Sequence, residues 1–149
     1  KFLLAPLEPT GMKELTAATV NYVKKINAKR LVLDSLSIAT MGWKTGEMDV
    51  TKIRAEVFSF IKSLKSLGVT SLLITEIPET DVRALSRFGF EEFLADGIIK
   101  LNYLGIGEAA YNNLEIRKMR RTAHSKGIVP MEFTKDGLKI STEKGKLHF

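Results

Sequence analysis

A carboxylate at the end of a short apolar run is the first feature of this sequence that could do chemistry. Asp34 directly follows the apolar residues 31–33 and precedes the hydroxyl of Ser35. An uninterrupted apolar run bounded by polar residues indicates a strand buried on both faces of a parallel sheet. Ligands bind at the carboxyl edge of such sheets, where a carboxylate can hold a hydrated magnesium ion beside nucleotide phosphates. Asp34 is therefore a candidate magnesium ligand, and an ordinary turn or cap residue is the alternative.

A second apolar run also ends on polar residues. Residues 69–74 read as a strand, and Thr75 and Glu76 follow it. If the two strands are parallel and neighbouring, as the right-handed crossover rule favours, Asp34 and Thr75 end on the same edge of the sheet. Ser35, Thr75 and Glu76 then become candidates for contacts with the same ligand as Asp34, with a plain turn again the alternative.

The third feature is a cluster of positive charge in one short segment. Its members are Arg117, Lys118, Arg120, Arg121 and Lys126. A net charge of +6 and a pI near 9.6 favour anionic partners, such as phosphates or nucleic acid, although a solvated basic surface has the same signature. The cluster contains no aromatic side chain, so base stacking, and with it nucleic-acid binding, is not favoured.

Strand alternation makes a more specific prediction for this cluster. Side chains at positions 114, 116, 118 and 120 should share one face, with positions 115, 117 and 119 on the other. Lys118 and Arg120 would then continue an apolar stripe. Because burying two cations without an anionic partner is costly, the strand should leave the core near Lys118 and present both charges at an edge.

Hydrophobic spacing and turn residues place the elements that must position these side chains. Helices are expected over residues 14–27 and 49–67, the second ending at Gly68. Strands are expected over residues 2–7, 30–33, 69–74, 97–101 and 114–120, with a hairpin of residues 131–134 and 138–140. Loops should cover residues 38–48, 78–93 and 105–113, with one helical turn allowed in the second. This order predicts a three-layer α/β fold with a mostly parallel sheet and an antiparallel hairpin extension.

Length and composition limit the remaining classes of protein. With 149 residues and 44% hydrophobic content, we expect a single domain over residues 1–149. The absence of cysteine excludes disulfides and thiolate chemistry and fits a cytoplasmic location, and His124 and His148 are too isolated for a zinc cluster. No apolar run is long enough to cross a membrane, so we expect a soluble protein with no membrane partner.

The order of these motifs resembles the KaiC-like branch of the RecA-type ATPases. The most specific part is the segment at positions 118–124, Lys-Met-Arg-Arg-Thr-Ala-His, followed by Pro130 and Phe133. The strand that ends at Asp34 resembles a Walker B strand. The resemblance also covers Thr75-Glu76, residues 96–101 and Asp136-Gly137, and thus nearly the whole chain.

The resemblance implies ATP and Mg²⁺ as ligands and a homo-oligomeric ring, possibly a hexamer, as the working assembly. In that family the nucleotide lies between subunits. Asp34 would hold the metal through water, while Lys118, Met119, Arg120, Thr122 and His124 would approach the ATP or ADP of the neighbouring subunit. The roles it implies as catalytic are those of Asp34, Lys118 and Arg120.

Two departures from the family pattern limit this reading. Arg121 stands where the family usually has glycine, so the turn there could differ and place Thr122 and His124 elsewhere. No glycine-rich Walker A loop occurs in the sequence, because in Gly42-Trp43-Lys44-Thr45 a tryptophan stands where glycine must precede the lysine. We expect the loop to precede Lys1 in the natural protein, and this chain alone to be inactive. The alternatives are a non-catalytic assembly or regulatory module of the same fold and, less favoured, a DNA-binding recombinase-like protein.

Overall fold

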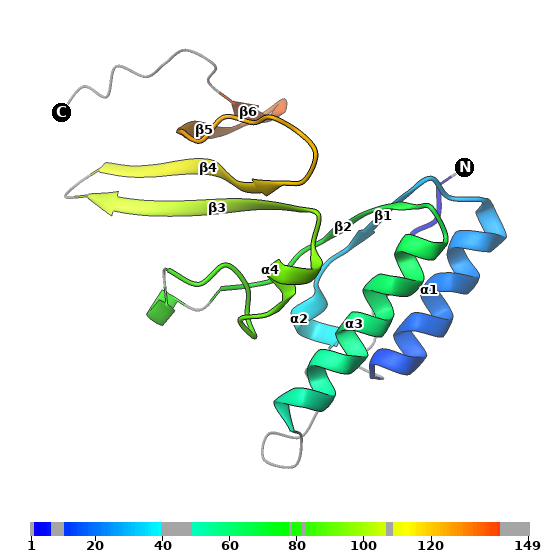
Figure 1. The fold of residues 1–149 in the computed structure, drawn as a ribbon. Helices are drawn as coiled ribbons and strands as arrows, with labels where there is room; N and C mark the ends of the chain where they lie inside the picture. Colours follow the sequence, from blue (N-terminus) through cyan, green and yellow to red (C-terminus); the bar gives the residue numbers. More distant parts are fainter. Residues whose placement is uncertain are drawn as a thin grey trace. The chain divides into compact units, whose positions relative to one another are not determined.

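The chain divides into two compact units, residues 1–94 and residues 95–149 (Figure 1). The structure, a computed structural model, describes residues 2–6, 11–39, 49–77, 79–81, 83–106 and 109–140. Parallel strands with helices fill the first unit and an antiparallel sheet the second, which confirms the expected α/β class with its antiparallel extension. That residues 1–149 form a single domain stays a prediction.

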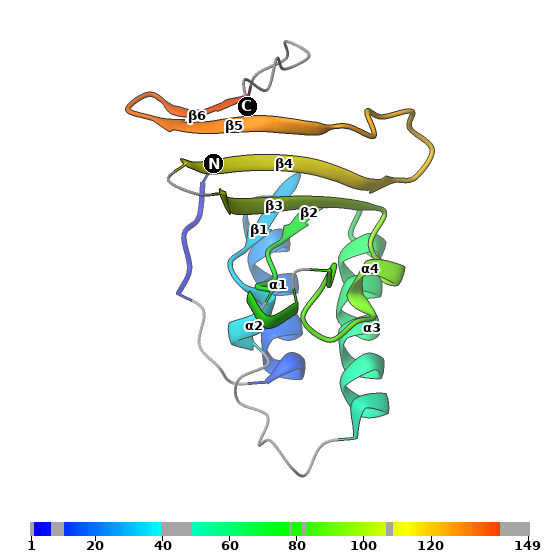
Figure 2. The same cartoon turned by 90° about the vertical axis from the view of Figure 1, so that its left-hand side faces the viewer.

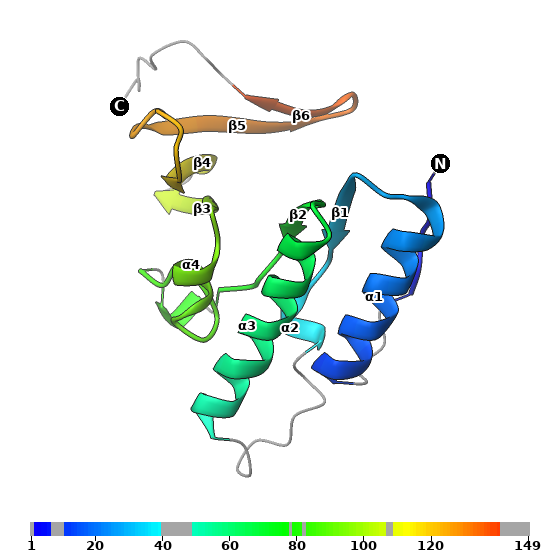
Figure 3. The same ribbon diagram turned by 45° about the vertical axis from the view of Figure 1, so that its right-hand side comes forward.

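The first unit alternates helices with two parallel strands. Its elements are α1 (Met12–Ile26), β1 (Arg30–Leu33), α2 (Leu36–Ala39), α3 (Val50–Ser66), β2 (Thr70–Leu73), the 3₁₀ helix η1 (Glu79–Asp81) and α4 (Glu91–Leu94). Strands β1 and β2 pair in parallel, and α1 lies beside α3 (Figure 3). Both long helices and both strands lie within two residues of the expected bounds. The loop expected over residues 78–93 contains η1 and the start of α4, and most of residues 38–48 lies outside the described part.

Helix α3 contributes an apolar face to the core of the first unit because its apolar residues recur at helical spacing. Val57, Phe60, Ile61 and Leu64 are all buried, as the sequence pattern predicts. Asp49 caps the helix by accepting a hydrogen bond from the N–H of Thr51 at 2.9 Å, and this bond lowers the pKa of the Asp49 carboxyl.

Gly68 follows the last residues of α3 with φ +65°, the left-handed conformation that the sequence predicts there. A side chain would be strained at this angle, so glycine suits the position.

The parallel strands are covered on one face only, which corrects the expectation of a strand buried on both faces. Leu33 is 7% exposed, whereas Val32 is 61% exposed and Leu72, its partner in register, is 53% exposed. Both α1 and α3 contribute to the core that contains Leu33, and no described residue buries the face of Val32. Sequence alone shows that all three residues of the run are apolar but not how many layers surround them.

The strand expected over residues 2–7 is also wrong for the described residues 2–6, which belong to no strand. Phe2 and Leu4 are 89% and 86% exposed. A strand needs a neighbour that accepts its backbone hydrogen bonds, and no described strand pairs with this segment. An apolar run was therefore insufficient to predict a strand here.

The second unit is an antiparallel sheet of four strands in the order β3-β4-β5-β6 (Figure 2). The strands are β3 (Gly97–Ile106), β4 (Ala109–Met119), β5 (Ile128–Thr134) and β6 (Gly137–Ile140). The β5–β6 hairpin lies where the sequence predicts it. The loop expected over residues 105–113 is wrong, because β3 and β4 extend through most of it. Asn102 and Asn113 pair across the two strands, with 3.1 Å from Nδ2 to Oδ1, so these asparagines hold the strands together instead of ending them.

A β-bulge near the end of β4 corrects the predicted alternation. Ile98 lies opposite Lys118, but Ile99 lies opposite Ile116, so Arg117 is the extra residue on β4. Directly opposite residues share a face, whereas Ile98 and Ile99 point to opposite faces. The bulge therefore places Lys118 on the face opposite to that of Ile116. Lys118 does not continue the apolar stripe, and a regular period of two could not have revealed this.

Candidate functional site

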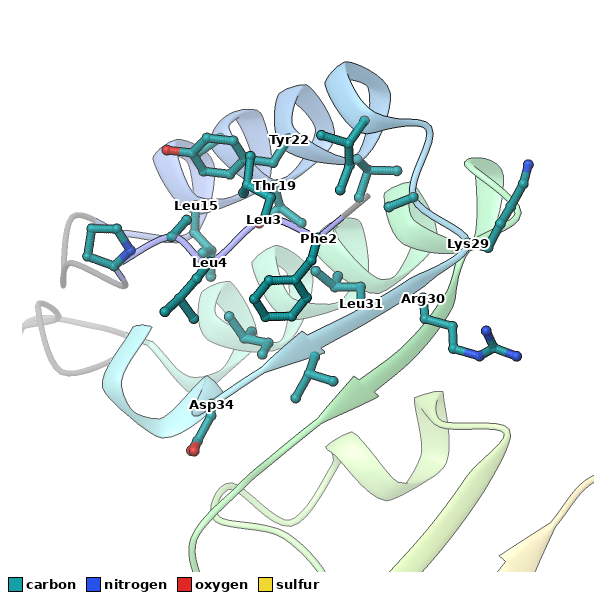
Figure 4. Close-up of a pocket in the computed structure, with 18 of the residues that line it drawn as sticks. Phe2, Leu3, Leu4, Leu15, Thr19, Tyr22, Lys29, Arg30, Leu31 and Asp34 are labelled. Atoms are coloured by element: carbon teal, nitrogen blue, oxygen red, sulfur yellow. The ribbon is translucent and has the colours of Figure 1, made fainter.

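Asp34 and Thr75 end neighbouring parallel strands at the same edge of their sheet, as the sequence predicts. The register aligns Leu33 with Leu73, and the N–H of Ile74 donates to the carbonyl of Leu33 at 3.0 Å. Asp34 is exposed, and Figure 4 shows its side chain at the carboxyl end of β1, pointing away from α1. Thr75 is half-buried and Glu76 is exposed. The rim expected from the sequence is therefore present in the first unit.

Buried serine side chains support this rim. Ser35 and Ser37 are each 1% exposed, and the N–H of Glu76 donates to Oγ of Ser37 at 3.0 Å. The N–H of Leu36 also donates to the carbonyl of Ile74 at 2.8 Å, which joins the start of α2 to the segment after β2. Sequence reasoning did not select Ser37. The signal was available, because a second hydroxyl two residues after Ser35 continues the polar end of the strand.

The Asp34–Ser35 peptide bond is cis.

The donor set at this edge suits magnesium better than a metal that requires a protein cage. No three His, Cys, Asp or Glu side chains gather into a metal-binding group within the described ranges. Magnesium usually keeps several waters and takes only one or two carboxylates, so the exposed carboxylate of Asp34 fits a water-mediated site.

An open apolar pocket lies behind the rim, between residues 2–6, α1 and β1 (Figure 4). Phe2, Leu4, Tyr22 and Leu31 are among its lining residues, and Asp34 stands at one end. Its cationic residues, Lys29 and Arg30, lie at the end away from Asp34, and most of the remaining lining is apolar (Figure 4).

The basic motif lies at the end of β4 and in the turn that follows. Met119 is the last residue of β4 and lies opposite Gly97, where an added Cβ would stand 2.9 Å from its sulfur. The N–H of Arg120 donates to the carbonyl of Asp96 at 2.8 Å. The Arg120 side chain, 49% exposed, also forms an ion pair with Asp96, with 3.1 Å from Nη1 to Oδ1. Asp96 was not among the predicted site residues, and two residues 24 positions apart give no sequence signal of this contact.

Thr122 and His124 follow in the same turn region. Thr122 is exposed and His124 half-buried. Nδ1 of His124 lies 2.9 Å from the carbonyl oxygen of Ser125, to which it donates, because a carbonyl can only accept. The structure thus brings Lys118, Met119, Arg120, Thr122 and His124 together in the second unit, while Asp34, Ser35, Thr75 and Glu76 lie together in the first.

Arg121 takes the conformation that a glycine would favour. Its φ is +58°, in the left-handed region. The turn after Arg120 is therefore compatible with glycine although arginine occupies it, and the substitution does not prevent the left-handed turn.

We expect Arg121→Gly to raise the free energy of unfolding by about 0.5–1 kcal/mol. Relief of left-handed strain is worth roughly 1–2 kcal/mol, and the greater freedom of glycine in the unfolded chain takes back about 0.5–1 kcal/mol. Urea denaturation measures the difference. Lys126→Gly is the matched control, because this exposed residue lies in the same connection without a positive φ, and its replacement should destabilise. A lower stability for Arg121→Gly than for the unaltered protein would contradict the strain argument.

Comparison with protein-family models identifies the family of this chain. The family model described as "ATPase: KaiC" matches residues 7–145. The chain belongs to the KaiC ATPase family. The predicted resemblance is thereby confirmed.

Curated KaiC proteins are similar to most of this chain. It is 34% identical over 118 residues to "Circadian clock oscillator protein KaiC" of Picosynechococcus, which covers 79% of this chain and 22% of the relative. It is 35% identical over 118 residues to KaiC 1 of Synechocystis, again with 79% of this chain and 22% of the relative. The chain therefore spans about a fifth of the length of these KaiC relatives.

A solved structure supports the same RecA-like fold. The KaiC-like protein of the hyperthermophilic archaeon Pyrococcus horikoshii superposes with a TM-score of 0.76 and 33% identity, over 89% of this chain and 57% of that one. As for the membrane, none of the helices in the described ranges combines the length and the apolar character that a crossing requires.

Proposed function

We propose that this chain forms part of an ATP-hydrolysing KaiC-type domain that works in a homo-oligomeric ring, and that it serves two nucleotide sites. Its Asp34 edge serves the site of its own subunit. Its Lys118-Met119-Arg120 turn serves the site of a neighbour. The observation that carries the proposal is that Asp34 and Arg120 are both charged, exposed and located at the ends of strands. A side chain that binds a ligand outside its own core must be exposed in this way.

The Asp34 edge has the chemistry of a magnesium-nucleotide site. Asp34 would hold Mg²⁺ through water, and the bound ion would supply positive charge to the phosphates. Thr75 and Glu76 place a hydroxyl and a carboxylate beside it. Ser35, being buried, contributes by supporting the edge on which Asp34 stands.

The second unit supplies the cations. Phosphoryl transfer needs in-line positioning and stabilisation of negative charge on the transferred group, which a neighbour's Lys118 and Arg120 can provide. Met119, Thr122 and His124 lie in the same stretch of chain and complete the surface that approaches the neighbouring ATP or ADP.

The proposal is tested by mixing two inactive variants. Asp34→Asn retains Arg120, and Arg120→Ala retains Asp34. In a head-to-tail ring assembled at random from equal amounts, about a quarter of the boundaries carry both residues, so up to about a quarter of normal ATP turnover should return. The measurement is phosphate release by the mixed full-length assembly, with mixing verified by native mass spectrometry.

The matched control mixes Asp34→Asn with the double variant Asp34→Asn, Arg120→Ala. No boundary then contains Asp34, so turnover should stay at the level of Asp34→Asn alone. If verified mixed rings of the two single variants regain nothing, the two residues do not act across a boundary. If the unaltered full-length assembly has no ATPase activity either, the non-catalytic module is the better assignment.

Nucleic-acid binding is not proposed, because the basic cluster contains no aromatic side chain on which bases could stack. Arg117 also forms an ion pair with Glu115 at 2.7 Å, which reduces the positive charge that a phosphate backbone would meet.

A further inference from the structure

We propose that Asp96 is a positioning residue that aims Arg120 at the neighbour's nucleotide. This inference rests on the proposed function and adds to it a residue at the same end of the antiparallel β3–β4 pair as Arg120. Asp96 directly precedes β3, and Arg120 directly follows β4. The antiparallel register, which pairs Gly97 with Met119, brings the two residues face to face.

Asp96 contacts Arg120 at two points. The carbonyl of Asp96 accepts the main-chain N–H of Arg120 at 2.8 Å, and its carboxylate accepts Nη1 at 3.1 Å. The first bond fixes where the chain leaves β4, and the second restricts the direction of the guanidinium. Without such contacts, the long side chain of Arg120 would sample many rotamers. In most of them the guanidinium would lie away from the phosphates that it must contact.

Gly97, the residue after Asp96, lets β3 and β4 approach each other closely at this end. A Cβ at Gly97 would stand only 2.9 Å from Sδ of Met119, which is closer than side-chain carbons normally approach. Main chain of β3 therefore packs directly against Met119, one residue before Arg120. Asp96 and Gly97 together set the position of two consecutive residues of the motif.

The ion pair is compatible with binding a phosphate. The side chains of Arg120 and Asp96 are 49% and 61% exposed, so the pair itself contributes little to stability. A guanidinium carries several N–H donors in a fixed fork and can serve a carboxylate and a phosphate together. The role of Asp96 is thus orientation, and its removal should alter the chemical step more than the fold.

Asp96→Ala in the full-length assembly should lower kcat for ATP hydrolysis by about 10- to 100-fold and change KM less than about twofold. Asp96→Asn keeps an oxygen that accepts Nη1, so it should restore part of this loss. The matched control is Glu115→Ala, which breaks the Glu115–Arg117 pair on the same strand and should change kcat less than about twofold.

The decisive comparison repeats Asp96→Ala in an Arg120→Ala background under single-turnover conditions. A residue that acts only by aiming Arg120 has nothing left to aim, so the second substitution should add no further loss. A further loss of the same size, or an Asp96→Ala kcat equal to that of Glu115→Ala, would overturn the proposal. Those results leave the proposed function standing, whereas unchanged turnover in Arg120→Ala alone would refute the function itself.

Discussion

Replacing Arg120 with alanine should lower ATP turnover of the full-length assembly by about three orders of magnitude or more. An arginine supplied to a phosphoryl-transfer site by a neighbouring subunit contributes roughly 10³–10⁵ in rate, because it neutralises charge that develops on the transferred group. We expect this of Arg120 because it lies in the turn at the end of β4, its side chain is half-exposed, and Asp96 contacts both its main chain and its guanidinium. Phosphate release at saturating ATP measures the effect.

Arg117→Ala is the control for this substitution. Arg117 lies on β4, three residues before Arg120, its side chain is about as exposed, and it too forms an ion pair with a carboxylate, that of Glu115. It lies outside the Lys-Met-Arg motif, so its loss should change turnover less than about twofold. Equal effects of the two substitutions would mean that general positive charge, and not a specific arginine, is what the site requires. Unfolding curves of both variants should coincide with that of the unaltered protein.

The largest expected effect on stability is at Phe60. Its side chain is 0% exposed in the centre of the first unit's core, among the buried faces of α1, α3 and β1. Truncation to alanine removes the packing of a whole ring and leaves a cavity that a close-packed core fills only in part. The free energy of unfolding should fall by about 3–5 kcal/mol in chemical denaturation.

Phe58 provides the control on the same helix. It lies two residues away and is 51% exposed, so Phe58→Ala should cost less than about 1 kcal/mol. Both substitutions change helix propensity equally, which leaves burial as the difference between them. Equal destabilisation by the two would contradict the buried face assigned to α3.

Local sequence determined the helices and the edge that carries Asp34. The core of α3 follows from apolar residues at helical spacing, and Gly68 ends it because a left-handed residue is needed there. Asp34 and Thr75 lie at the same edge of the sheet because two apolar runs form parallel strands joined by a right-handed crossover. These features depend on contacts within a few residues or on a topological rule, so a single sequence contains the information.

Pairing and packing between distant segments decided which segments form strands and which apolar residues are buried. An apolar pattern predicted a strand over residues 2–7, and turn residues predicted a loop over residues 105–113, but pairing partners determine which segments become strands. Val32 has the same character as Leu33, yet only the packing of helices on one face buries one and exposes the other.

The direction of the basic motif was decided in the same way. The sequence identified Lys118 and Arg120 as the cations of interest but placed Lys118 on the apolar face, because strict alternation cannot reveal a bulge at Arg117. The contact of Asp96 with Arg120 joins residues 24 positions apart and exists only because β3 and β4 pair in one register. The sequence by itself thus determined which residue types could do chemistry, and the tertiary structure decided which way they point and what holds them there, since both depend on contacts between distant parts of the chain.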